Sequence, residues 1–133
     1  MVGETRVAIE HEGDIVTARQ KGRELAAAHG LSMTEQTLVA TAISEIARNI
    51  VVYARRGEMV LGTVEDRGRR AVMVIARDEG PGIANPELAM REGYTTGNSL
   101  GMGLPGARRL MDEFELSSAL GKGTIVTMKK WVR

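Results

Sequence analysis

Residues 32–55, SMTEQTLVATAISEIARNIVVYAR, carry the most regular hydrophobic pattern of the chain. Apolar residues recur there at helical spacing, and they are Val39, Ala42, Ile43, Ile46, Ala47, Ile50, Tyr53 and Ala54. This spacing predicts an amphipathic helix with one buried face, which runs to about Arg55 and stops at Gly57. Ser32 followed three residues later by Glu35 is typical of a capping box, so we expect the helix to begin near Ser32.

Shorter patterns on both sides of this helix complete the expected fold. Before it, they predict a strand over 6–10 and a helix over 15–28 with Asp14 as N-cap. After it, they predict a hairpin of strands over 59–64 and 71–76 with Gly68 in its turn, and a short helix over 87–91. The chain then continues with a helix from Pro105 to Phe114 and two closing strands over 115–120 and 124–131. Helices and strands do not alternate regularly in this order. The sequence therefore predicts an α+β fold, a two-layer sandwich of a mixed, mostly antiparallel sheet with helices on one face.

The composition is that of an ordinary soluble domain. The chain has 133 residues, 43% hydrophobic and 26% charged, which predicts a single domain over 1–133 with its own core. Eighteen Lys and Arg against 17 Asp and Glu leave a net charge of +1, so no bulk charge draws the chain to nucleic acid or an anionic membrane. The absence of cysteine excludes disulfides and thiolate metal sites, and two histidines argue against a histidine-built zinc site. The N-terminus shows no signal-peptide pattern, which favours a cytoplasmic location.

Two polar residues of the central helix are the first candidates for a functional site. Glu45 and Asn49 are four residues apart, so their side chains project from the same flank of the apolar stripe. A carboxylate and an amide in that position suit a hard cation such as Mg²⁺, or a proton acceptor beside a metal ligand. Taken alone, the pair also fits a solvated helix flank, and both interpretations stay open.

A second candidate is the segment Asp78-Glu-Gly-Pro-Gly82, which follows the apolar run 71–76. It places a carboxylate at a strand end, over a backbone that lacks Cβ atoms at two positions. A ligand can approach such a backbone closely. The alternative is an ordinary turn in which Asp78 caps backbone amides.

A third candidate is the glycine-rich stretch from Gly97 to Gly106, which leads into the helix expected from Pro105. Backbone amides in such a loop, at the N-terminus of a helix, predict an anion site suited to phosphate. Gly101, Gly103 and Gly106 also match the G-x-G-x-x-G spacing of dinucleotide-binding folds. That interpretation fails because no strand directly precedes the glycines and no acidic residue follows about 20 positions later. The Walker A pattern fails as well, since no Gly-Lys is followed by Ser or Thr.

The fourth motif, Gly121-Lys-Gly-Thr124, lies between the closing strands and by itself predicts a hairpin turn. The order of the four motifs is more specific than any one of them. Glu-x-x-x-Asn on a helix, Asp-x-Gly-x-Gly after a strand, a glycine-rich loop before a helix and Gly-x-Gly-Thr in a last hairpin resemble the GHKL ATPase and kinase superfamily. The resemblance covers residues 32–130.

Within that superfamily, the chain is similar to the small bacterial serine kinases and anti-sigma factors, and among these to the stressosome switch-protein kinases. The segments that carry this similarity are 14–20, 45–49, 78–83, 100–106 and 110–114, together with the ending Lys130-Trp-Val-Arg133.

The resemblance implies a Bergerat-type ATP-binding fold with a role for each motif. Asp78 would bind the exocyclic amine of adenine, with Thr124 near by. Asn49 would be a ligand of the Mg²⁺ that bridges the phosphates, and Glu45 would be the general base. The other implied nucleotide-binding positions are Gly80, Gly82, Ile83, Gly101, Met102, Gly103 and Leu104, and residues 94–100 would form the ATP lid.

The resemblance also implies a function. It is that of a Mg-ATP-dependent serine/threonine protein kinase that phosphorylates STAS-domain partners of the stressosome type, and that after release activates a PP2C-type phosphatase. The alternative is an ATP-responsive binding module, such as an anti-sigma factor, in which phosphorylation is secondary. Glu45 beside Asn49 favours the kinase, because a pure binder needs the metal ligand but no base.

Overall fold

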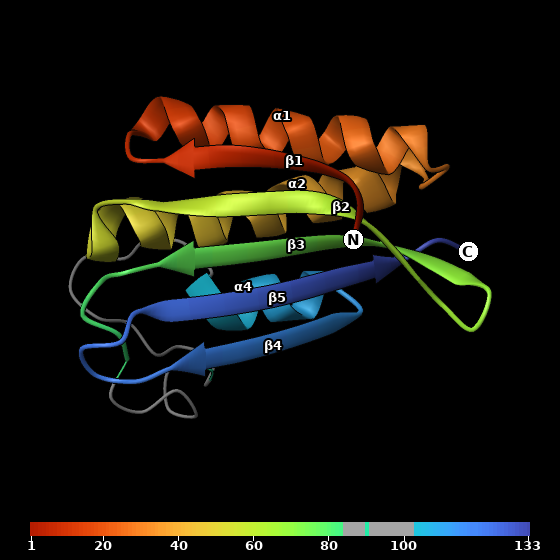
Figure 1. Ribbon diagram of the computed structural model, residues 1–133. Helices are drawn as coiled ribbons and strands as arrows, with labels where there is room; N and C mark the ends of the chain where they lie inside the picture. The colour runs from red at the N-terminus through yellow and green to blue at the C-terminus, as the bar shows by residue number, and fades with distance from the viewer. Residues whose placement is uncertain (84–89, 91–102) are drawn as a thin grey trace.

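The computed structural model describes residues 1–83, 90 and 103–133, and these form a helical layer on one face of a sheet (Figure 1). The elements are β1 (Val2–Ile9), α1 (Glu12–Ala28), α2 (Met33–Asn49), η1 (Ile50–Ala54), β2 (Gly57–Asp66), β3 (Arg69–Asp78), α4 (Gly103–Leu110), β4 (Glu113–Ser118) and β5 (Thr124–Trp131). The expected α+β sandwich is confirmed. The short helix expected over 87–91 lies outside the described residues, except for Met90.

The described strands form one sheet in the order β1-β2-β3-β5-β4, and every neighbouring pair is antiparallel. The hairpin predicted between β2 and β3 is confirmed. Its two-residue turn consists of Arg67 and Gly68, both with positive φ, as a type I′ turn requires. Alternate residues of each strand face the helices, and this face buries Met59, Leu61, Val72, Val74, Ala76, Val126 and Met128.

The central helix α2 forms as its sequence predicts. Ser32 is the N-cap, and its Oγ accepts a hydrogen bond from the Glu35 amide at 3.1 Å while the Glu35 carboxylate accepts one from the Ser32 amide at 3.3 Å. Among the described residues, Met33–Ala54 is the one helical stretch whose length and composition would allow it to cross a membrane. Its apolar stripe is instead buried in the hydrophobic core from Val39 to Ile50, as the core helix of a folded domain requires, whereas Tyr53 is exposed.

The end of this helix differs from the prediction. The α-helix stops at Asn49 and continues as one π-helical turn, η1, after which Arg55 adopts a φ of 72° and ends the helix. Gly57, expected as the stop, is the first residue of β2. The predicted end near Arg55 is confirmed, but the predicted stop at Gly57 is wrong because a left-handed arginine gives no signal in the sequence. π-Helical turns are frequent at functional sites, and this one directly follows Asn49.

Boundaries near both ends of the chain also differ from the prediction, and β1 begins at Val2, four residues before its predicted start. Helix α1 begins at Glu12, so Asp14 lies inside its first turn and is not the N-cap. The carboxylate of Asp14 accepts hydrogen bonds from the amides of Glu10 and His11, both at 2.9 Å, and these bonds lower its pKa. At the other end of the chain, α4 stops before Phe114.

Helix α4 spans Gly103–Leu110, so it begins two residues before Pro105 and ends well before Phe114. Strand β4 then begins at Glu113, and Phe114 is a strand residue packed against the core. The reason is that apolar and polar residues alternate here, as is typical of a strand. Phe114 and Leu116 face the core, while Glu113 and Glu115 are exposed. This alternation overrides the helical spacing.

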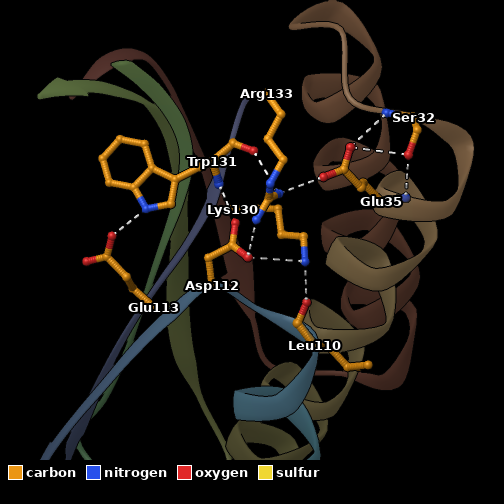
Figure 2. Close-up of polar contacts among 8 residues, drawn as sticks. All are labelled: Ser32, Glu35, Leu110, Asp112, Glu113, Lys130, Trp131 and Arg133. Carbon is orange, nitrogen blue, oxygen red and sulfur yellow. Dashed lines mark hydrogen bonds and ion pairs between the residues drawn. The ribbon is translucent and has the colours of Figure 1, made fainter. Parts of the chain in front are cut away.

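A polar network ties the end of β5 and the C-terminal Arg133 to α2 and to the end of α4 (Figure 2). Arg133 pairs with Glu35 of α2 at 2.9 Å and with Asp112 at 3.0 Å. Lys130, with a side chain only 8% exposed, donates to the carbonyl of Leu110 at 2.9 Å. Loss of hydration works against ionisation of Asp112, but the hydrogen bond from Arg133 and the charge of Lys130 hold its pKa below the usual value. The network therefore fixes the C-terminal end of α4.

Candidate functional site

Three polar side chains meet at one end of the sheet because their strands are paired there. Asp78 of β3 is the cross-strand partner of Thr124 of β5, and Thr124 is the partner of Ser118 of β4. Strand alternation places all three on the same face as the buried residues Ala76 and Val126, the face that the helices cover. The register therefore brings together Asp78 and Thr124. These two candidate residues come from two separate sequence motifs.

The carboxylate of Asp78 has one oxygen in its own turn. Oδ1 accepts a hydrogen bond from the Gly80 amide at 2.9 Å, which fits the ordinary-turn interpretation. Within the described residues, Oδ2 receives no hydrogen bond. The two interpretations of this segment are thus compatible, because the turn orients the carboxylate and leaves one oxygen to accept a bond from a ligand.

The turn after Asp78 and the β4–β5 hairpin pack backbone against backbone. Gly82 and Gly123 have φ values of 76° and 74°. A Cβ at Gly82 would collide with the carbonyl of Ala119, and a Cβ at Gly123 would collide with the carbonyl of Asp78. These glycines therefore allow the hairpin to close on the turn, which fixes Asp78 against Thr124.

Two hydrogen bonds hold this contact. The Gly121 amide donates to the carbonyl of Pro81 at 2.8 Å, and the Ile83 amide donates to Ser118 Oγ at 2.8 Å. Ile83, a predicted nucleotide-binding residue, is partly buried against the core. Its placement next to the turn follows from these bonds.

Glu45 links α2 to the first residue of α4. Its Oε2 accepts a hydrogen bond from the Gly103 amide at 3.2 Å, and its Oε1 pairs with Arg48 Nη1 at 3.3 Å. The Glu45 side chain is only 12% exposed, which argues against the solvated-flank interpretation. The first amides of a helix have no partner within the helix and attract anions. The structure thus joins the candidate base to the described end of the predicted phosphate loop.

The remaining predicted residues occupy distinct positions. Asn49 is half-buried on α2, one turn after Glu45 and directly before the π-helical turn. Leu104 is 9% exposed and belongs to the hydrophobic core, so it anchors the start of α4. Gly101 and Met102, like the predicted lid over 94–100, lie outside the described residues.

The donor atoms fit Mg-ATP better than a metal held by protein alone. The described part of the chain brings no three His, Cys, Asp or Glu side chains together as a metal site. Mg²⁺ in nucleotide sites usually takes one or two protein oxygens and completes its shell with phosphate and water. The amide oxygen of Asn49 and the carboxylate of Glu45, one turn apart on α2, are oxygen atoms of the type that could serve as such ligands.

Sequence reasoning missed two residues of the site. Arg48 contacts Glu45 but lies inside a motif in which only the outer residues were assigned roles. Ser118 was predicted only as a strand residue. Because Ser118 and Thr124 are equally far from Gly121 at the hairpin turn, counting outward from that turn would have paired them.

Comparison with known proteins identifies the family. The family model of the histidine kinase-like ATPase domain matches residues 9–130. The serine/threonine-protein kinase RsbT of Bacillus subtilis (strain 168) is 47% identical over 127 residues, which are 96% of each chain. The anti-sigma F factor of Caldanaerobacter subterraneus subsp. tengcongensis is 34% identical over 100 residues, 71% of this chain and 68% of that one.

A solved structure agrees at the level of the fold. The RsbU and RsbW domains of a Mycobacterium tuberculosis protein match with a TM-score of 0.67 at 19% identity, over 99% of this chain and 33% of that one. The four motifs, the antiparallel sheet with its helical layer, and the match over 9–130 agree with one another. The chain therefore belongs to the family of histidine kinase-like ATPase domains, within the GHKL superfamily.

Proposed function

We propose that this chain is a serine/threonine protein kinase that transfers the γ-phosphate of Mg-ATP to a hydroxyl of a STAS-domain partner in a partner-switching pathway. The similarity to RsbT, at 47% identity over 96% of both chains, supports the kinase activity. The observation that carries the chemistry is the contact between the Glu45 carboxylate and the Gly103 amide at 3.2 Å. It holds a proton acceptor beside an anion-attracting helix terminus.

The base of the nucleotide would be bound by Asp78 and Thr124. Oδ2 of Asp78 would accept a hydrogen bond from the exocyclic amine of adenine, while Oδ1 stays bonded to the Gly80 amide. Thr124 lies beside Asp78 as its cross-strand partner. The packed turns at Gly82 and Gly123 keep both acceptors in place before the ligand arrives, which lowers the cost of ordering the site on binding.

The phosphates would lie between the start of α4 and the flank of α2. Phosphoryl transfer requires mainly positioning and charge neutralisation, and bound Mg²⁺ supplies much of that neutralisation. Asn49 would be the protein ligand of this ion. The Gly103 amide would donate to phosphate oxygen, which requires it to give up its present bond to Glu45.

Glu45 would act as the general base. An attacking serine or threonine hydroxyl must lose its proton during transfer, and the Glu45 carboxylate would accept it. Arg48 pairs with Oε1 and so holds the carboxylate in one orientation. Histidine phosphorylation would not need this base, because a neutral imidazole nitrogen can attack without losing a proton.

By family similarity, phosphorylation of the STAS partner would release this chain to activate a PP2C-type phosphatase. The same similarity, together with the composition, supports a cytoplasmic location.

Replacement of Asn49 by alanine should weaken nucleotide binding mainly when Mg²⁺ is present. The reason is that the amide oxygen of Asn49 binds the metal and not the base or sugar. Calorimetric titration with ATP in Mg²⁺ and in EDTA measures the difference. Asn49→Asp, which keeps a ligand oxygen, is the matched variant and should retain Mg²⁺-dependent binding. Equal losses with and without Mg²⁺ would remove Asn49 from the metal site.

The acceptor can be identified directly. The protein is mixed with Mg-ATP and a candidate STAS-domain protein, and the phosphate is mapped by mass spectrometry. We expect acid-stable phosphate on a serine or threonine of the STAS protein. Acid-labile phosphohistidine, or label confined to this chain, would overturn the proposal. Binding of the partner with no transfer would instead favour the ATP-responsive binding module.

A further inference from the structure

The hydroxyl of Ser118 lies where three segments of the nucleotide site meet. Its Oγ is 2.8 Å from the Ile83 amide nitrogen, 2.9 Å from the Gly123 carbonyl oxygen and 2.8 Å from Thr124 Oγ1. All three distances are those of good hydrogen bonds. One side chain thus contacts the turn after β3, the β4–β5 hairpin and the hydroxyl of Thr124.

The three contacts fix the direction of two hydroxyl protons. A serine hydroxyl has one proton to donate and can accept two hydrogen bonds. The Ile83 amide can only donate, so Ser118 accepts there. The Gly123 carbonyl can only accept, so Ser118 uses its single proton there. The remaining contact therefore requires Thr124 to donate its proton to Ser118.

This arrangement leaves Thr124 with no proton for a ligand. Its oxygen can then only accept hydrogen bonds from other groups. The neighbouring carboxylate of Asp78 is also acceptor-only when it is ionised. This end of the sheet therefore presents two acceptors side by side, on cross-strand partners.

We propose that Ser118 is a positioning residue that sets nucleotide specificity by taking up the proton of Thr124. Two acceptors match the 6-amino group of adenine, which donates, and oppose the 6-oxo group of guanine, which accepts. Without Ser118, the hydroxyl of Thr124 could turn its proton toward the ligand and donate to a 6-oxo group. This inference rests on the proposed binding of the nucleotide base at Asp78 and Thr124.

The test compares ATP with GTP, because a purely structural role would weaken both nucleotides equally. Affinities of the full chain for Mg-ATP and Mg-GTP are measured by calorimetry for the unchanged protein and for Ser118→Ala. We expect Ser118→Ala to lower the ATP/GTP affinity ratio by about five- to tenfold, since one hydrogen-bond direction is no longer fixed. An unchanged ratio would overturn the inference.

The neighbouring residue provides a matched control. Ser117 is exposed and points to the other face of the same strand, so Ser117→Ala should leave both affinities unchanged. Ser118→Thr keeps the hydroxyl on a strand that tolerates β-branched residues, and it should preserve the ratio. Loss of selectivity in Ser118→Thr would count against the role of the hydroxyl.

A second variant keeps the test decisive if Ser118→Ala does not fold. Thr124→Val removes the acceptor oxygen itself and should also lower the ATP/GTP affinity ratio. In a double-mutant cycle, Ser118→Ala should change the ratio no further once Thr124 is valine, because it acts through Thr124. If Thr124→Val leaves the ratio unchanged, the inference fails. If the unchanged protein binds no ATP at all, the proposed function itself fails.

Discussion

Replacement of Glu45 by glutamine should slow phosphoryl transfer to the partner by about 10²–10⁴-fold, the usual contribution of a positioned general base. The affinity for Mg-ATP should change little. Glutamine has almost the same size and shape as glutamate, and in the nucleotide-free protein its amide oxygen can still accept the hydrogen bond that Gly103 would give up on binding phosphate. What it cannot do is take a proton from the attacking hydroxyl. Single-turnover transfer from labelled ATP, with ATP affinity measured in parallel, separates the two effects.

The matched control for this variant is Glu24→Gln. Glu24 has an exposed side chain on α1, where it pairs with Lys21. The same chemical change there should leave both transfer and nucleotide affinity unaltered. If Glu45→Gln transfers phosphate at the normal rate, the carboxylate serves only to link α2 to α4. The base would then have to be another group or be unnecessary.

The contacts of Glu45 show why this outcome is a real alternative. The same carboxylate that would accept the proton also bonds the first amide of α4 and pairs with Arg48. Leu104, next to Gly103, lies in the hydrophobic core, and Lys130 holds the other end of α4 through the carbonyl of Leu110. Helix α4 is therefore anchored by packing and by its C-terminal end. Loss of one bond at Gly103 should leave it in place, so an effect on transfer can be assigned to the base.

The parts of the fold that the sequence predicts well are those that depend on local patterns. The capping box at Ser32, the apolar stripe of α2 and the turn at Gly68 each rest on residues close together in the chain. The predictions that were wrong have two different causes. The helix stops at Arg55 rather than at Gly57 because Arg55 adopts a left-handed conformation, which an arginine does not signal. Phe114 leaves the expected helix because the alternating residues 113–116 form a strand that pairs with β5, and this pattern competes with the helical spacing.

The candidate site follows the same division. Asp78 and Thr124 were found as motifs, but only the strand register makes them neighbours. The contact between Glu45 and Gly103 joins residues 58 positions apart, and a motif gives no reason for it. The sequence gives no reason to select Ser118, because a serine in a strand is common and its three partners, Ile83, Gly123 and Thr124, become neighbours only in the fold. The sequence thus predicted the chemical groups of the candidate site, and the packing of strands and helices determined which of them lie together.

Asp78 gives the second large expected effect, because one substitution separates its two roles. Asp78→Asn should weaken ATP binding by about ten- to a hundredfold, the range expected when a hydrogen bond to a charged acceptor is lost. The asparagine oxygen can still accept the bond from the Gly80 amide, so the turn should keep its shape. Its amide nitrogen would then face the exocyclic amine of adenine as a second donor, in place of an acceptor.

The measurement is calorimetric titration with Mg-ATP, together with thermal unfolding to confirm that the fold is intact. Asp66→Asn makes the same change at an exposed position at the far end of β2 and should leave ATP binding unaltered. Asp78→Ala should lose as much affinity and, because nothing then caps the Gly80 amide, should also lower the melting temperature. An Asp78→Asn protein that binds ATP normally would show that this carboxylate only caps its turn. The adenine site would then have to lie elsewhere, and the pairing of Asp78 with Thr124 would be a feature of the sheet alone.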